Sequence, residues 1–171
     1  SFYNDKSVND VERPFITRWK ATAGEMLKIP LVGQNYKLVI KNAADGRVLK
    51  TETSLTIEEL NEPYQYTPTE NGEILVEAGP DGVAFIQMQS SHVTYGSTES
   101  LLAVEQFGTV LWTSMSYAFA GCENMQFGPD IDAPNLSEII DLNYTFLNCT
   151  SFNQSLNTWN VGRINYMTGM F

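Results

Sequence analysis

The sequence predicts a mainly β protein with short helices: an N-terminal β-sandwich followed by the first coils of a solenoid. Short apolar segments separated by turn residues fill the first 95 positions, which is typical of a sandwich. Near the C-terminus one phrase recurs after 27 and again after 25 residues, and such periods are typical of stacked solenoids. We therefore expect a flexible lead-in over residues 1–13, a β-sandwich over 14–97 and a repeat segment over 98–171.

The strands expected in the first segment are rich in aromatic and β-branched residues and are bounded by Gly, Pro and Asn. Asp45-Gly46 stands between two apolar runs and predicts a hairpin turn. Ser54, with acidic residues after it, predicts the cap of one short helical turn over residues 54–60. The strands are expected at residues 14–20, 26–32, 36–40, 64–66, 73–77 and 83–88.

The repeated phrase spans residues 115–125 and 142–152, and it starts again at 167–171. Its aligned aromatic positions are Phe119, Phe146 and Phe171. Each unit fits a short strand followed by a helical turn, with its apolar positions in the core. Residues 101–112 are expected to form the edge unit that closes one end of the stack. Because Phe171 falls inside a repeat, we expect the natural protein to continue.

The C-terminal phrase also carries a family resemblance. Asn148-Cys-Thr-Ser-Phe-Asn-Gln-Ser-Leu-Asn-Thr-Trp-Asn-Val161, continuing to Met167-Thr-Gly-Met-Phe171, closely resembles the BspA-like leucine-rich-repeat surface proteins of the DUF285 group. Phe15-Ile-Thr-Arg-Trp-Lys20 looks like the opening of the immunoglobulin/PKD-like β-domain that often precedes these repeats. The resemblance implies a bacterial cell-surface or secreted protein whose relatives are associated with adhesion to host matrix proteins and to other cells.

Composition narrows the classes of partner. Ten basic and twenty acidic residues give a net charge of −10, which disfavours nucleic acid because phosphate binding needs a basic face. No run approaches the roughly 18 apolar residues of a membrane span, so we expect no direct membrane span.

The sequence offers little for catalysis, and we expect no catalytic residue, no cofactor and no metal. His92 is the single histidine, and its surroundings resemble neither a nucleophile elbow nor a zinc-binding helix. A hydrolytic β-domain would need two converging carboxylates, for which no motif is present. Two acidic loops, 79–82 and 128–132, leave calcium as an alternative to ordinary turn chemistry.

Cys122 and Cys149 are 27 residues apart and should occupy the same place in adjacent coils. Their Cα atoms would then lie about 5 Å apart, a separation that a disulfide tolerates. Parallel inward side chains seldom give the disulfide dihedral, so a buried ladder of free thiols is favoured and a disulfide is the alternative. Asn148, Asn153 and Gln154 are expected to hydrogen-bond backbone groups where the coils turn.

The resemblance, together with the lack of catalytic motifs, implies a non-enzymatic extracellular or bacterial cell-surface protein that adheres through its leucine-rich-repeat surface to a host extracellular-matrix or cell-surface protein, with fibronectin and fibrinogen as examples. Tyr117 and Tyr144 share one phase of the repeat and are the candidate partner-binding residues. The alternative is a structural spacer or display module whose recognition site lies in missing repeats. Self-association through an exposed end of the solenoid is also expected.

Overall fold

The computed structural model describes residues 11–171, so the predicted lead-in lies outside the described residues except for 11–13. The expectation of a mainly β protein is confirmed, whereas the expectation of short helices is wrong, because residues 11–171 contain no helix. Accordingly, none of this part of the chain forms an apolar helix that could span a membrane. The described residues form nine strands: β1 (Phe15–Ala21), β2 (Leu27–Ile29), β3 (Leu31–Asn42), β4 (Val48–Ile57), β5 (Tyr64–Tyr66), β6 (Gly72–Ala78), β7 (Val83–Ile86), β8 (Leu101–Gln106) and β9 (Gln126–Phe127).

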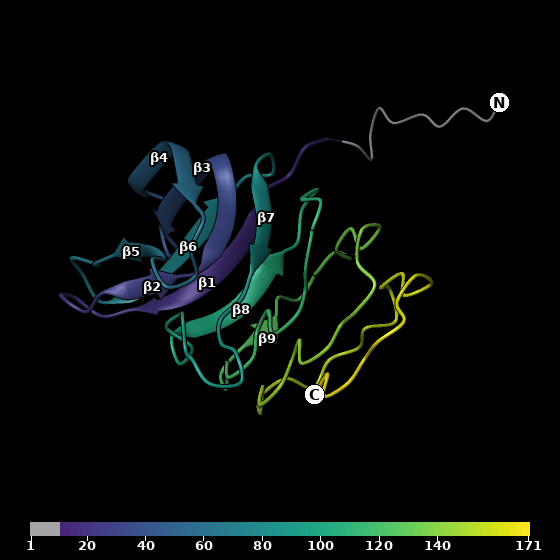
Figure 1. Cartoon of the computed structure of the whole chain (residues 1–171). Helices are drawn as coiled ribbons and strands as arrows, with labels where there is room; N and C mark the ends of the chain where they lie inside the picture. Colours follow the sequence, from purple (N-terminus) through teal and green to yellow (C-terminus); the bar gives the residue numbers. More distant parts are fainter. Residues whose placement is uncertain (1–10) are drawn as a thin grey trace.

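Seven of the strands form one open sheet, in the order β4-β3-β6-β1-β8-β9 with β7 paired to β3. All its pairs are antiparallel except β8 with β9, which are parallel. The other two strands, β2 and β5, pair separately. Figure 1 shows β4 on the side of the sheet away from residues 107–171, here called the C-terminal coils, while β8 lies beside them.

The alternation of β1 explains which face of the sheet is buried. Phe15, Thr17 and Trp19 are almost fully buried, whereas Arg18 between them points outward. Arg18 lies 3.0 Å from a carboxylate oxygen of Glu73 on β6 and 3.0 Å from one of Glu105 on β8. One face of the sheet therefore contributes to the core, and the other carries ion pairs across neighbouring strands.

The hairpin predicted at Asp45-Gly46 is confirmed, because β3 and β4 pair across it and Gly46 takes a positive φ of 76°. The helical turn predicted for residues 54–60 is wrong, because β4 continues to Ile57. Ser54 does not cap a helix; its hydroxyl lies 3.0 Å from the Asn35 side-chain oxygen. Pairing with β3 outweighs the local capping signal, since the β-branched residues of this segment suit a strand.

The C-terminal coils, residues 107–171, contain β9, two isolated parallel bridges (Leu111 with Asn135 and Asp141 with Tyr166) and a series of turns. The first, second and third coils hold the copies of the repeated phrase at residues 115–125, 142–152 and 167–171. The predicted helical turns fail here for a specific reason. The amides of Ala118, Ala120 and Cys122 donate to carbonyls three residues back in the same coil. The amides between them donate to the next coil instead, and this alternation prevents the continuous ladder that a helix requires.

The coils and the sheet meet at β8. Its partner β9 already lies in the first coil, and the Gly128 amide donates to the Val104 carbonyl 2.8 Å away. Asp132 accepts hydrogen bonds from the amides of Phe107 and Gly108 and from the guanidinium of Arg13. The buried apolar side chains of both parts form one continuous cluster. The boundary expected between residues 97 and 98 stays a prediction.

Candidate functional site

The repeated phrase places equivalent residues of successive coils side by side. The Tyr117 amide donates to the Asn143 carbonyl and the Phe119 amide to the Thr145 carbonyl. The Tyr144 amide in turn donates to the Thr168 carbonyl, 2.9 Å away. These bonds align the three copies with offsets of 27 and 25 residues, the same spacings that the sequence shows.

Tyr117 and Tyr144 come together as the repeat predicts. Their rings stack with centroids 4.7 Å apart and an interplanar angle of 18°. Both residues are half-buried, so part of each ring remains at the surface. The third equivalent position is Gly169, and a side chain there would lie only 2.4 Å from the Tyr144 ring. The Tyr144 ring therefore covers the backbone of the third coil.

The two tyrosines also share an unusual backbone. Tyr117 has a φ of 56° and Tyr144 a φ of 59°, and Gly169 matches them at 56°. The left-handed region costs an ordinary residue roughly 1–2 kcal/mol because its Cβ crowds the following carbonyl. Two tyrosines are thus held in strained conformations at the same place in consecutive coils. Such strain is maintained only where the surrounding structure fixes it, and it is concentrated at functional sites.

A second left-handed position recurs four residues later, at Gly121 and Asn148, with φ of 79° and 59°. The sequence pointed to Asn148 as a turn residue but not to this conformation. The signal was present, because Gly and Asn are the residues that most readily adopt positive φ. Gln154 fulfils its prediction: its side-chain amide bonds both the amide and the carbonyl of Phe127 in the previous coil.

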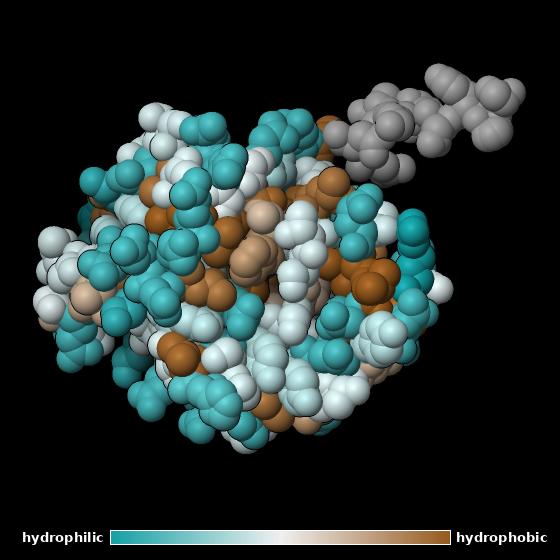
Figure 2. Space-filling model, in the orientation of Figure 1, coloured by the Kyte–Doolittle hydropathy of each residue, from teal (hydrophilic) through white to brown (hydrophobic). Residues whose placement is uncertain are grey.

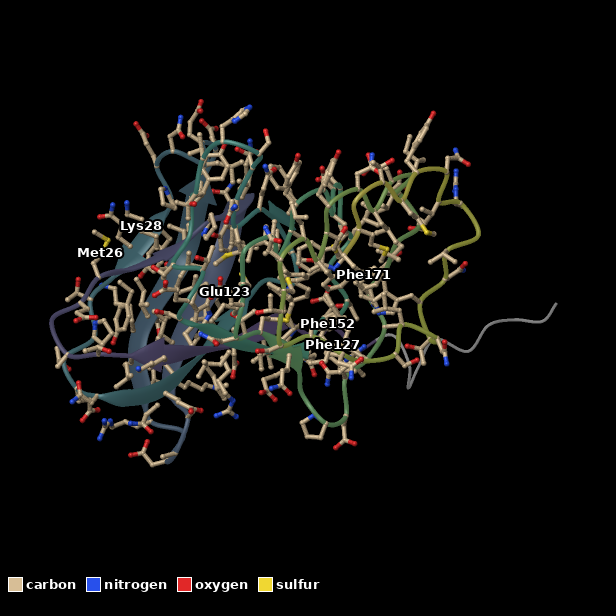
Figure 3. The ribbon with its side chains drawn as sticks, turned by 90° about the horizontal axis from the view of Figure 1, so that it is seen from below. Met26, Lys28, Glu123, Phe127, Phe152 and Phe171 are labelled. Atoms are coloured by element: carbon tan, nitrogen blue, oxygen red, sulfur yellow. The ribbon has the colours of Figure 1, made fainter. Side chains whose placement is uncertain are left out.

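Behind the tyrosines runs a ladder of phenylalanines. Phe119 stacks on Phe146 with centroids 5.8 Å apart, and Phe146 stacks on Phe171 at 5.7 Å. A second contact joins Phe127 to Phe152 at 4.8 Å, and Figure 3 shows these two rings close together with Phe171 nearby. Phe146 is buried, whereas Phe171, the last residue of this sequence, is 69% exposed.

The surface of the coils is a mixture of polar and apolar side chains. Leu111, Ile140 and Tyr166 are each about half exposed, at 48%, 54% and 56%. In Figure 2 apolar side chains reach the surface over the coils and in the middle of the molecule, between hydrophilic areas. Many protein–protein interfaces are a similar mixture of polar and apolar side chains, with aromatic residues at their centre.

Cys122 and Cys149 are free and buried, which agrees with the favoured ladder of thiols. The Cys149 sulfur lies 3.0 Å from the Phe119 carbonyl oxygen of the previous coil, to which its thiol donates. Burial raises the pKa of Cys149 to about 12 and raises that of Cys122 well above its ordinary value. Both side chains are therefore protonated, and neither is an activated nucleophile.

The other candidate residues lie apart from one another. His92 is exposed, and its ring makes no hydrogen bond within residues 11–171. In the acidic loop 128–132, Asp130 is exposed whereas Asp132 is already engaged by Arg13 and two amides. Within the described residues no three His, Cys, Asp or Glu side chains converge on a position that could hold a metal ion.

A hollow of about 680 Å³ lies over the ends of β3, β4 and β7, away from the tyrosines. Glu58 is the single charged residue among those that line it, so it offers no pair of groups for acid–base chemistry. Its lining residues are Val32, Gly33, Gln34, Asn35, Ile57, Glu58, Gly82 and Ala84.

Residues 89–171 match the family model described as "Mycoplasma protein of unknown function, DUF285". This match covers the coils and the segment that leads into them, and it supports the DUF285 family for that part of the chain. No curated protein and no solved structure matches the chain.

Proposed function

We propose that this chain is part of a non-enzymatic cell-surface or secreted protein that adheres to another protein through the face of its C-terminal coils. The stacked pair Tyr117 and Tyr144 is the observation that carries the proposal. The two half-buried aromatic rings are fixed by backbone hydrogen bonds between coils. They give a rigid contact surface that loses little conformational entropy when a partner binds.

The finer fold assignments belong to the same proposal. The coils are the beginning of a BspA-like leucine-rich-repeat solenoid, and the strands before them are an immunoglobulin/PKD-like sandwich. The coil-to-coil hydrogen bonds and the phenylalanine ladder support the first assignment. The burial of Leu27 and Ile29 of β2 in the same core as Trp19 supports the second.

The partner we propose is a host extracellular-matrix protein or another cell-surface protein, which requires an extracellular location. Fibronectin and fibrinogen are the first ligands to test. Tyrosine suits this role because its ring offers apolar contact and its hydroxyl a hydrogen bond at the rim of an interface. The net charge of −10 further favours partners with a basic surface.

Surface-plasmon resonance of the chain over immobilised fibronectin, fibrinogen and a control protein tests the proposal. The informative variants are Tyr117→Asn and Tyr144→Asn, because Asn tolerates positive φ and removes the ring without adding backbone strain. We expect each to weaken saturable binding by roughly tenfold or more, the typical loss at an aromatic anchor.

Tyr66→Asn is the matched control, because Tyr66 is also half-buried but lies on β5. Binding that survives both coil variants and fails in the control would contradict the proposal. A folded wild-type chain that binds no matrix or cell-surface protein would leave the alternative of a spacer or display module.

A further inference from the structure

The free edge of β4 is a second surface that the proposed adhesion does not use. β4 pairs with β3 on one side, and within residues 11–171 no strand pairs with its other side. Three of its ten residues are Thr, and every one of the ten is at least partly exposed. Figure 1 shows this edge facing away from the C-terminal coils. Such an edge presents unpaired amides and carbonyls that another strand can join.

The chemistry of this edge selects the strand that fits it. Within β4 the only charged residues are Lys50 and Glu52, so the segment is neutral although the chain as a whole carries −10. Lys50 and Glu52 lie on the same face of the strand, with the ammonium 3.5 Å from a carboxylate oxygen. Their side chains are 50% and 29% exposed, so both remain accessible to a further charged group.

We propose that two copies of this chain pair antiparallel through β4, about a twofold axis at Thr51. In this register Lys50 of each copy lies opposite Glu52 of the other, which gives two ion pairs between the copies. Moving the axis by one residue would place Lys50 opposite Lys50, or Glu52 opposite Glu52, and like charges directly opposite are destabilising. The charges therefore specify one register.

The backbone of β4 favours the same register independently. Lys50, Thr51 and Glu52 pair in a regular way with Ile40, Val39 and Leu38 of β3. Register shifts interrupt the β3–β4 pairing on both sides of this stretch. A strand is a good template only where its ladder is regular, so two copies align best when their regular stretches face each other. That alignment is also centred on Thr51.

Sedimentation equilibrium of the full chain over a range of concentrations and two salt concentrations tests the proposal. We expect a reversible monomer–dimer equilibrium that weakens at high salt, because the ion pairs lie at an accessible edge. Lys50→Glu and Glu52→Lys should each weaken dimerisation by roughly tenfold or more, since each places like charges opposite one another.

The double variant Lys50→Glu/Glu52→Lys is the matched control, because it restores both ion pairs and keeps the composition. It should dimerise like the wild type. An equimolar mixture of the two single variants should form a heterodimer, since each supplies the charges that the other lacks. Far-UV circular dichroism of each variant checks that the strands are intact.

Three outcomes would overturn the proposal: a monomeric wild type at every soluble concentration, a dimer that neither charge reversal weakens, and a double variant that stays monomeric while folded. Phe171→Ser separates this edge from the exposed end of the phenylalanine ladder. Self-association that this variant abolishes, and that the charge variants leave unchanged, would assign the interface to the coils instead.

Discussion

The strands of residues 15–106 and the coils of residues 107–171 satisfy their backbones in different ways. In the strands, partners are mostly antiparallel and the chain reverses at turns such as Asp45-Gly46. In the coils, alternate amides bond within one coil and to the next, so that each coil depends on its neighbour. The strand region therefore holds itself together by sheet pairing, whereas the coils rely on stacking and on the sheet edge at β8 and β9.

This difference explains where strain and aromatic residues are found. The positive φ values of Tyr117 and Tyr144 occur in the coils, where backbone bonds to the next coil fix them. The aromatic contacts gather there as well, because short irregular coils bury their core mainly through large rings. We call the contact between the coils and the sheet, around Phe107 and Asp132, the seam. The comparison predicts that a substitution at the seam destabilises both regions. A substitution farther along the coils should destabilise only the coils.

The largest effect is expected at the seam. Phe107 is fully buried. Its ring centroid lies 6.1 Å from that of Phe15 on β1 and 5.5 Å from that of Phe127 in the first coil. Phe107→Ala should lower the free energy of unfolding by about 3–5 kcal/mol. Urea unfolding followed by circular dichroism and by tryptophan fluorescence should show one transition shifted for both probes.

Val93→Ala, at a side chain 45% exposed, is the control and should change stability by less than about 0.5 kcal/mol. If the coils of Phe107→Ala unfold early while the strands keep their wild-type midpoint, the two regions are separate folding units.

The next effect concerns the polar link between the regions. Asp132→Ala removes the acceptor for the amides of Phe107 and Gly108, which lie 2.6 and 2.9 Å from its oxygens, and leaves Arg13 without its carboxylate. We expect a loss of about 2–3 kcal/mol in the free energy of unfolding, measured by urea denaturation. Asp130→Ala, two residues earlier and exposed, should be nearly neutral; equal losses for the two would disprove the link.

A glycine in each region sharpens the comparison further. Gly46→Ala adds a Cβ at φ of 76° with nothing within 4 Å, so only backbone strain of about 1 kcal/mol is expected. Gly169→Ala adds the same strain and also drives its Cβ to 2.4 Å from the Tyr144 ring. The midpoint of thermal unfolding should therefore be lower for Gly169→Ala than for Gly46→Ala. Amide hydrogen exchange in Gly169→Ala should be faster than in the wild type in the last two coils. The reverse ranking would mean that the Tyr144 ring is not held against the third coil.

The smallest effect is a pH dependence that comes from the coils. Burial raises the pKa of Cys149 to about 12, so this thiol stays protonated in the folded state while the unfolded chain loses the proton near pH 9. The unfolded state then binds fewer protons, and stability falls as pH rises through this window. Between pH 9 and 10 each buried cysteine should remove about 1 kcal/mol.

Urea midpoints at pH 9 and 10 check this effect in the wild type and in Cys149→Ala. The variant should lose roughly a third of the slope, because Cys122 and the tyrosines Tyr36, Tyr64 and Tyr66 remain. Burial raises the pKa of each of these tyrosines, so together they contribute about as much as one cysteine in this window and more at higher pH. An unchanged slope in the variant would show that the Cys149 thiol is accessible to solvent.

Alternating apolar residues and the turn residues beside them predicted the positions of several strands. The strands at 15–21, 64–66, 72–78 and 83–86 lie within two residues of their expected bounds, because their alternation and flanking turn residues are strong signals. The segment after Ser54 was misassigned because its capping pattern competes with pairing to β3, and pairing is not visible in one segment alone. In the coils the phase shared by Tyr117 and Tyr144 was readable, but their left-handed backbone was not.

The sequence by itself determined the β character, the hairpin at Asp45-Gly46 and the period that brings Tyr117 onto Tyr144, because alternation, turn residues and spacing are local or repeated properties. Only the tertiary structure decided that the coils contain no helix, that Asp132 joins them to Arg13, and that no strand within residues 11–171 pairs with the second edge of β4. The physical reason is that each of these depends on groups that are distant in the chain. An amide that bonds across coils, for example, cannot also bond along a helix.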